Sequence, residues 1–315
     1  MNYVEVLNAD NNNSGDTIVD IGNRMILNQI FGFNYFISCY FNNTENISNF
    51  NKRFFPNISL ISGTPWIWNR CHETNKYKNL LEFTKDKKTY KIDLSIGSSF
   101  YLDFDPSKAS MNLNIWNNFD LIFCRDTLAY TLLSKVVDNV FLMPCSSFYV
   151  HHLMNSYEPV KEDLLIYQNI KTTLHKKKNS LTKDFHRVQY EFYEEKNPDV
   201  FVITKEDQDE FLKKYPKSKC KLIKSPIDIY AEISKYKNLL TPRVHSSIPA
   251  LSYGLNVVNV PSDSRCLTAI GLGAEIHPEM KKYINYNDDL LVKFPLSFDF
   301  YLNRLKEELE KKGIK

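Results

Sequence analysis

The sequence predicts an α/β fold made of two Rossmann-like domains that face each other across a cleft. Two observations support this prediction. Short apolar runs alternate with segments whose apolar residues recur at helical spacing, which is typical of mostly parallel sheets joined by helices. A polar, irregular stretch at 150–162 then interrupts the alternation, so we place a domain boundary there. The predicted domains are residues 1–150 and 151–315.

The first half of the chain predicts one helix followed by a series of strands. Ile18, Ile21, Met25 and Ile30 recur near helical spacing, which predicts a helix at 17–31. Short apolar runs bounded by turn residues predict strands at 34–40, 58–62, 91–96, 121–124 and 140–143.

The second half repeats this alternation. Apolar runs predict strands at 164–167, 200–204 and 222–223, and a β-branched run predicts another at 257–260. Helices are expected to begin at Lys205 and to cover 227–237. A charged amphipathic segment at 298–315 predicts a last helix that packs back over the junction between the domains.

Glycines and small polar residues follow successive predicted strands. They occur in Gly63-Thr64-Pro65, in Gly97-Ser98-Ser99 and after Arg125-Asp126. Ligands of open α/β sheets bind at the carboxyl ends of the strands, where loops and helix N-termini meet. Each of these residues alone is equally typical of an ordinary turn. Their recurrence favours a ligand site at this edge.

Thr241-Pro242-Arg243-Val244-His245 places a fixed cation and a titratable imidazole two residues apart. The pair opens an apolar helical segment that ends at Gly254. A helix N-terminus favours anions, and Arg adds a planar fork suited to carboxylate or phosphate. His adds a proton that moves near neutral pH. The element therefore predicts an anion site with acid–base capacity.

Composition limits the classes of function. The chain has 315 residues, of which 43% are hydrophobic and 14% aromatic, enough for a globular core. Its 40 basic and 37 acidic residues are mixed along the chain, so the net charge of +3 does not predict nucleic-acid binding.

The six cysteines lack the C-x-x-C spacing of a zinc site and are expected to be free thiols in a reducing compartment. His151 and His152 lie without a cluster of ligands, so no metal is predicted. The first residues lack the pattern of a signal peptide, and no apolar run approaches the roughly 20 residues of a membrane span. We expect a cytoplasmic, soluble protein.

The order of motifs along nearly the whole chain resembles the polysaccharide pyruvyl transferase family. The matching residues are Asn13-Ser14-Gly15-Asp16, Ser62-Gly63-Thr64-Pro65, Ile96-Gly97-Ser98-Ser99, Cys124-Arg125-Asp126-Thr127, Arg243-Val244-His245, Gly254-Leu255-Asn256-Val257-Val258, Asp263-Ser264-Arg265 and Gly271-Leu272-Gly273. Only the Arg-x-His block and the downstream Asp-x-Arg are specific. The resemblance implies a GT-B-like fold and transfer of a pyruvyl group from phosphoenolpyruvate to sugar hydroxyls, of the ketal-forming type, with release of phosphate. It implies no cofactor beyond the donor substrate.

The implied chemistry gives roles to three residues. Phosphoenolpyruvate carries a carboxylate and a phosphate, which the guanidinium groups of Arg243 and Arg125 would hold. His245 would act either as the acid that protonates the donor methylene or as the base for the sugar hydroxyl. Arg125 alternatively forms a structural pair with Asp126 or Asp120. The resemblance adds five donor-binding residues: Gly15, Asp16, Gly97, Ser98 and Ser246.

Candidate acceptor residues are Trp66, His72 and Asp263. Trp66 and its neighbour Trp68 either stack on a sugar or belong to the core. His72 is either a second acid–base group or a surface residue, and Asp263 either contacts substrate or caps a helix at 264–272. Pro65 departs from the family pattern and removes an N–H that a phosphate cradle would use.

Two other functions remain open at this point. A GT-B glycosyltransferase would use the same cationic pair to bind the diphosphate of a nucleotide-sugar. A degenerate family member would bind a glycan or a partner without turnover, although the presence of both Arg243 and His245 argues against it. Acceptor identity, linkage and oligomeric state do not follow from the sequence pattern.

Overall fold

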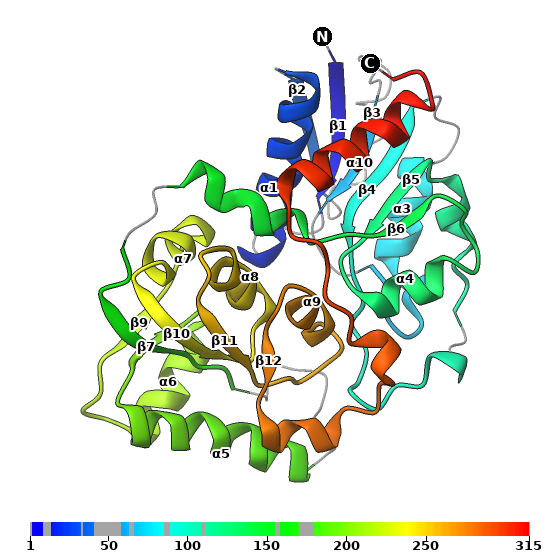
Figure 1. Ribbon diagram of the computed structural model, residues 1–315. Coiled ribbons are helices and arrows are strands. Elements are labelled where there is room, and N and C mark those ends of the chain that lie inside the picture. The colour runs from blue at the N-terminus through cyan, green and yellow to red at the C-terminus, as the bar shows by residue number, and fades with distance from the viewer. Residues whose placement is uncertain are drawn as a thin grey trace. The chain divides into compact units, whose positions relative to one another are not determined.

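The computed structural model describes residues 2–8, 14–32, 34–40, 58–62, 66–84, 89–108, 111–154, 158–169 and 179–314 (Figure 1). The chain divides into two compact units. Unit 1 consists of Met1–Ser99, Pro106–Tyr149 and Phe294–Lys315, and unit 2 of Phe100–Asp105 and Val150–Lys293. Each unit is built on a parallel sheet, which confirms the predicted α/β class.

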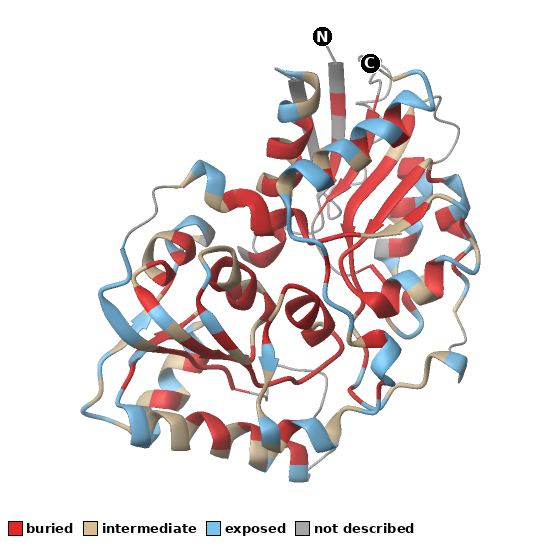
Figure 2. Cartoon of the chain, viewed as in Figure 1, coloured by how far each residue is buried: buried red, intermediate tan, exposed pale blue. Residues whose placement is uncertain are grey.

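The described strands of unit 1 form a six-stranded sheet in the order β2-β1-β3-β4-β5-β6, with every neighbouring pair parallel. The strands are β1 (Asn2–Asn8), β2 (Asn34–Tyr40), β3 (Ile58–Ser62), β4 (Tyr90–Ile96), β5 (Leu121–Cys124) and β6 (Val140–Leu142). Every residue of β3 and β5 is buried (Figure 2). Strands covered on both faces are continuously apolar, which is why these runs stand out in the sequence.

The α-helices described in unit 1 are α1 (Ser14–Phe31), α3 (Asn75–Thr84), α4 (Thr127–Leu133) and α10 (Phe298–Glu310). Helix α10 lies beside α1 and packs on the sheet. Its Tyr301 is fully buried, donates a hydrogen bond to the carbonyl of Leu94 (2.9 Å) and meets the ring of Phe123 edge-on. The C-terminal segment therefore belongs to unit 1. This corrects its assignment to a domain at 151–315.

The described strands of unit 2 form a second parallel sheet in the order β12-β11-β10-β7-β8-β9. They are β7 (Lys161–Ile166), β8 (Asp199–Val202), β9 (Cys220–Leu222), β10 (Tyr236–Thr241), β11 (Asn256–Asn259) and β12 (Glu275–Ile276). The α-helices are α5 (Asn179–Lys196), α6 (Lys205–Lys214), α7 (Pro226–Ile233), α8 (Val244–Ser252) and α9 (Cys266–Gly271). Helix α7 is shorter than predicted because β10 begins at Tyr236.

Helix α8 joins β10 to β11 and carries the Arg-x-His element at its start. Arg243 is the N-cap residue, with extended backbone angles, and the helix follows directly. Gly254 has φ 78°, in the left-handed region that glycine adopts without strain, so the chain turns there into β11. No helix within the described ranges is long and apolar enough to cross a membrane.

Candidate functional site

In unit 1, residues that follow β4 meet residues that follow β5. Asp126 accepts hydrogen bonds from the backbone N–H of Ser98 (2.7 Å) and from the Ser98 hydroxyl (2.9 Å). It also caps α4 by accepting from the N–H of Ala129 (2.8 Å). Burial raises the pKa of Asp126, and these hydrogen bonds oppose that rise. Asp126 is therefore a structural residue that ties the two strand ends together.

Arg125 is 1% exposed and has no ion pair with any residue that the structure describes. Within the same residues its Nε and Nη2 atoms have no hydrogen-bond partner, and Nη1 lies 3.9 Å from the Cys145 sulfur. The alternative of a structural pair with Asp126 or Asp120 is not formed, since Asp120 instead accepts from the N–H of Lys91. Leaving a buried charged donor unpaired costs free energy, so this guanidinium is a strong candidate for binding an anion.

Gly97 lies directly against Arg125. A Cβ atom at position 97 would lie 2.5 Å from Arg125 Nε, closer than real Cβ contacts, and 3.1 Å from Asp126 Oδ2. The carbonyl of Gly97 accepts from Ile67 (3.2 Å), and Ile67 in turn accepts from Ser99 (2.8 Å), so the segment after β3 adjoins the same edge. A side chain at position 97 would therefore have to displace the guanidinium of Arg125.

Unit 1 also contains the buried acidic residues Asp93 and Asp16. Asp93 on β4 is fully buried, and burial raises the pKa of its carboxyl to about 7 in spite of a hydrogen bond from Ser95 and the charge of Arg125. Asp16 and Gly15 are buried in the first turn of α1, where the helix dipole favours an acid. The sequence analysis named Asp16 and Gly15 but not Asp93. Asn13 and Gly63-Thr64-Pro65, including the departure at Pro65, lie outside the described residues.

In unit 2, Arg243 is held by a carboxylate from a different helix. Its Nη2 atom pairs with Asp207 Oδ2, and Asp207 is fully buried in the first turn of α6. The Nε atom of Arg243 is buried and lacks a hydrogen-bond partner in the described part of the chain. Burial lowers the pKa of Arg243, Asp207 raises it, and the nearby charge of Arg265 lowers it. One side of this guanidinium is thus engaged, while Nε is not.

His245 and Ser246 lie in the first turn of α8, directly after Arg243. His245 is half-buried, and Ser246 is buried with its N–H bonded to the Arg243 carbonyl (3.1 Å). A cation, an imidazole and a hydroxyl therefore share the start of one helix. Such a set can hold an anion and transfer a proton beside it.

Asp263 and Arg265 form a second ion pair in unit 2. Asp263 accepts from Arg265 Nε (2.8 Å), Nη2 (2.6 Å) and the backbone N–H (3.0 Å). Helix α9 begins after them, at Cys266, whose N–H bonds the carbonyl of Asp263. Asp263 thus orients Arg265, and its predicted contact with an acceptor stays a prediction.

The structure places Trp66 in the core of unit 1. Its side chain has no exposed surface, and its ring meets Trp116 edge-on with centroids 6.4 Å apart. This packing agrees with the core role that the sequence analysis left open for Trp66, and its contact with an acceptor stays a prediction. His72 is half-buried in a 3-10 turn at Cys71–Glu73, with Nε2 3.8 Å from Glu73.

Most of the chain matches one known protein family. A family model described as polysaccharide pyruvyl transferase matches residues 13–264, which include Arg125, Arg243 and His245. The chain belongs to the polysaccharide pyruvyl transferase family. No curated protein matches it significantly.

Solved structures match this pyruvyl transferase family member along its whole length. The S. aureus MnaA–UDP co-structure has 11% identity and a TM-score of 0.62, covering 99% of this chain and 97% of that one. The Methanocaldococcus jannaschii UDP-GlcNAc 2-epimerase in complex with UDP-GlcNAc and UDP has 10% identity and a TM-score of 0.60, with 98% and 99% covered. The UDP-GlcNAc 2-epimerase of Neisseria meningitidis has 11% identity and a TM-score of 0.58, with 99% and 100% covered. These likenesses show a GT-B-like fold.

The predicted site residues of this family member fall into two groups. Gly97, Ser98 and Arg125 meet in unit 1, while Arg243, His245 and Ser246 share the start of α8 in unit 2. Asp207 was missed by the sequence analysis. The sequence shows Asp207 as an acid in the first turn of α6, three residues after the N-cap Thr204. No sequence pattern near Asp207 predicts its contact with Arg243.

Two other features of the pyruvyl transferase family member bear on ligands. Among the described side chains, no group of three or more His, Cys, Asp or Glu is placed to hold a metal ion.

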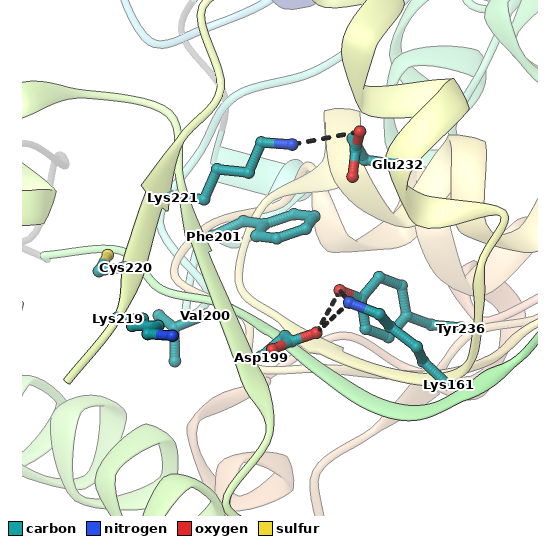
Figure 3. Close-up of a pocket in the computed structure, with 9 residues that line it drawn as sticks. All are labelled: Lys161, Asp199, Val200, Phe201, Lys219, Cys220, Lys221, Glu232 and Tyr236. Atoms are coloured by element: carbon teal, nitrogen blue, oxygen red, sulfur yellow. Dashed lines mark hydrogen bonds and ion pairs between the residues drawn. The ribbon is translucent and has the colours of Figure 1, made fainter.

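A pocket of about 310 Å³ lies in unit 2 at the amino ends of β7, β8, β9 and β10 (Figure 3). There Lys161 pairs with Asp199 (2.6 Å) and Lys221 with Glu232 (3.1 Å), so these cations are already neutralised. This pocket is at the edge of the sheet opposite Arg243, which follows the carboxyl end of β10.

Proposed function

We propose that the protein transfers a pyruvyl group from phosphoenolpyruvate to hydroxyl groups of a sugar in a glycan or glycan precursor, with release of phosphate. The observation that carries the proposal is the start of α8, where the partly engaged guanidinium of Arg243 precedes His245. Family membership supports it. In unit 1, the buried guanidinium of Arg125 has Nε and Nη2 atoms without hydrogen-bond partners among the described residues, so it is a separate candidate for binding an anionic group of the donor.

The chemistry requires one proton to be delivered and another to be removed. Protonation of the donor methylene carbon makes C2 electrophilic, and a sugar hydroxyl then adds to C2 and loses its proton to a base. The C2–O bond to phosphate breaks with its electron pair on phosphate, and a second hydroxyl of the sugar takes its place in a ketal while its proton passes to the departing phosphate. His245 holds one of these protons at its imidazole, while arginine offsets the charge of the departing phosphate.

Donor binding is tested by thermal unfolding of the purified protein with phosphoenolpyruvate and, separately, with UDP-, GDP- and CMP-sugars. A ligand that binds only the folded protein raises Tm. We expect phosphoenolpyruvate to raise Tm in the wild type and in the control Arg187→Ala, whose arginine lies on α5, but not in Arg243→Ala. Stabilisation by a nucleotide-sugar alone would instead indicate glycosyl transfer.

The role of His245 is tested by turnover, measured as phosphate released from phosphoenolpyruvate in the presence of sugar acceptors. His245→Ala is expected to lower kcat about 100-fold or more, because a positioned acid or base contributes on this order. The fold should be retained, since His245 is only half-buried. His277→Ala, in the same unit, is the matched control and should keep its activity. Full turnover by His245→Ala would exclude His245 as the proton carrier.

A further inference from the structure

We propose that Asp207 is a positioning residue for the donor site, which fixes the guanidinium of Arg243 and leaves its Nε atom for the donor. This inference rests on the proposed function and deepens it. Asp207 lies 36 residues before Arg243 in the chain, in the first turn of α6, and their side chains are joined by one hydrogen-bonded ion pair.

The carboxylate of Asp207 is itself firmly anchored. Its side chain has no exposed surface, and Oδ1 accepts a hydrogen bond from the backbone N–H of Asn169, just after β7 (2.8 Å). The N–H of Asp207 donates to the Thr204 hydroxyl at the N-cap of α6 (3.1 Å). One oxygen is therefore occupied by backbone, and the other faces Arg243.

The backbone of Arg243 is equally constrained. Its N–H donates to the Thr241 hydroxyl (3.1 Å), and its carbonyl accepts from the N–H groups of Ser246 (3.1 Å) and Ser247 (3.0 Å). The backbone is thus held at one end of the side chain and Nη2 is held by Asp207 at the other, with 20% of the side chain exposed. The buried Nε then has no partner within the described chain and remains for a ligand.

Asp207 also stabilises the charged form of Arg243. Burial and the charge of Arg265 both act against a charged guanidinium at Arg243, whereas Asp207 favours it. Arg265 has its own carboxylate, Asp263, to which it makes two side-chain hydrogen bonds. The unit thus holds two arginines near each other, each oriented by one buried acid.

The opposite role would be competition, in which Asp207 occupies Arg243 until the donor displaces it. A competing carboxylate must move away, but Asp207 accepts a hydrogen bond from the N–H of Asn169, and moving it would break that buried hydrogen bond. The two roles predict opposite changes. Loss of a positioning residue raises KM for phosphoenolpyruvate, and loss of a competitor lowers it.

The test is Asp207→Asn, which keeps an oxygen for Asn169 and places N–H donors against the guanidinium. We expect KM for phosphoenolpyruvate to rise about tenfold or more, with kcat changed less than about threefold and KM for the acceptor unchanged. The matched control is Asp184→Asn, which removes a carboxylate bonded to Arg187 elsewhere in unit 2. It should leave KM for phosphoenolpyruvate unchanged. Asp207→Glu, which keeps the charge, should restore part of the loss, and it also replaces Asp207→Asn if that variant does not fold.

A double-mutant cycle decides whether Asp207 acts through Arg243. In an Arg243→Ala background, Asp207→Asn should cause no further rise in KM for phosphoenolpyruvate, measured at donor concentrations that saturate the weakened site. An unchanged or lower KM in Asp207→Asn, or additive effects in the cycle, would overturn the inference while the proposed function stands. A wild-type protein that neither binds nor consumes phosphoenolpyruvate would overturn the proposed function and the inference with it.

Discussion

At the scale of single residues, Arg125 depends on the absence of a side chain at Gly97. The methyl group of Gly97→Ala would lie 2.5 Å from Arg125 Nε and must displace the guanidinium. We expect KM for phosphoenolpyruvate to rise about tenfold or more, as in a loss of donor contacts. In an Arg125→Ala background the same substitution should add nothing. An unchanged KM in Gly97→Ala would mean that Arg125 does not bind the donor.

Asp93 predicts a dependence of stability on pH. Burial raises its folded pKa to about 7, whereas an unfolded Asp titrates near 4. Between these values the folded protein retains a proton that the unfolded chain releases. This contribution to stability is therefore full below about pH 4 and is lost as pH rises toward 7, by up to about 1.4 kcal/mol per pH unit.

The measurement is urea unfolding between pH 5 and 8, followed by tryptophan fluorescence. All three tryptophans, Trp66, Trp68 and Trp116, lie in unit 1 and report on its unfolding. Asp93→Asn, a neutral replacement of the same shape, should remove the slope and gain stability relative to wild type as pH rises to 7. Parallel curves for the two proteins would contradict a raised pKa.

At the scale of elements, Asp126 joins the start of α4 to the end of β4. Asp126→Ala removes the acceptor of the Ala129 N–H at the start of α4 and the acceptor of the buried N–H and hydroxyl of Ser98. We expect the free energy of unfolding of unit 1 to fall by about 3 kcal/mol, measured by urea unfolding. Asp126→Asn retains an oxygen for the cap and should lose much less. Equal losses in both variants would show that charge, not capping, is the contribution of Asp126.

At the scale of the whole molecule, the last helix completes the first unit. Helix α10 buries Tyr301, Leu305 and Leu309. Removing residues 298–315 should therefore lower the free energy of unfolding of unit 1 by about 5 kcal/mol or more, seen in tryptophan fluorescence. Amide exchange in β7 and β10 of unit 2 should change little.

The control for this truncation is Tyr301→Phe, which loses only the hydrogen bond to the Leu94 carbonyl and should cost about 1 kcal/mol. Faster exchange throughout unit 2 in the truncated protein would contradict the assignment of α10 to unit 1.

The sequence by itself determined most strands and the start of α8. The strands predicted at 34–40, 58–62 and 121–124 have these bounds in the structure. Apolar periodicity and turn residues act over a few neighbouring positions, so they can be recognised in one sequence. The proximity of Arg243 and His245 is equally local. The strand β1, by contrast, was not predicted, although Val4, Val6 and Leu7 are buried in it.

Only the tertiary structure decided which side chains meet. Asp126 bonds Ser98 across 28 residues, Asp207 pairs with Arg243 across 36, and Tyr301 bonds Leu94 across 207. The same holds for Arg125, which sequence reasoning placed either in an ion pair or at a ligand, and whose Nε and Nη2 atoms have no hydrogen-bond partner among the residues that the structure describes. Such contacts depend on strand order and on which strand ends become neighbours, and no local pattern of residues specifies that order.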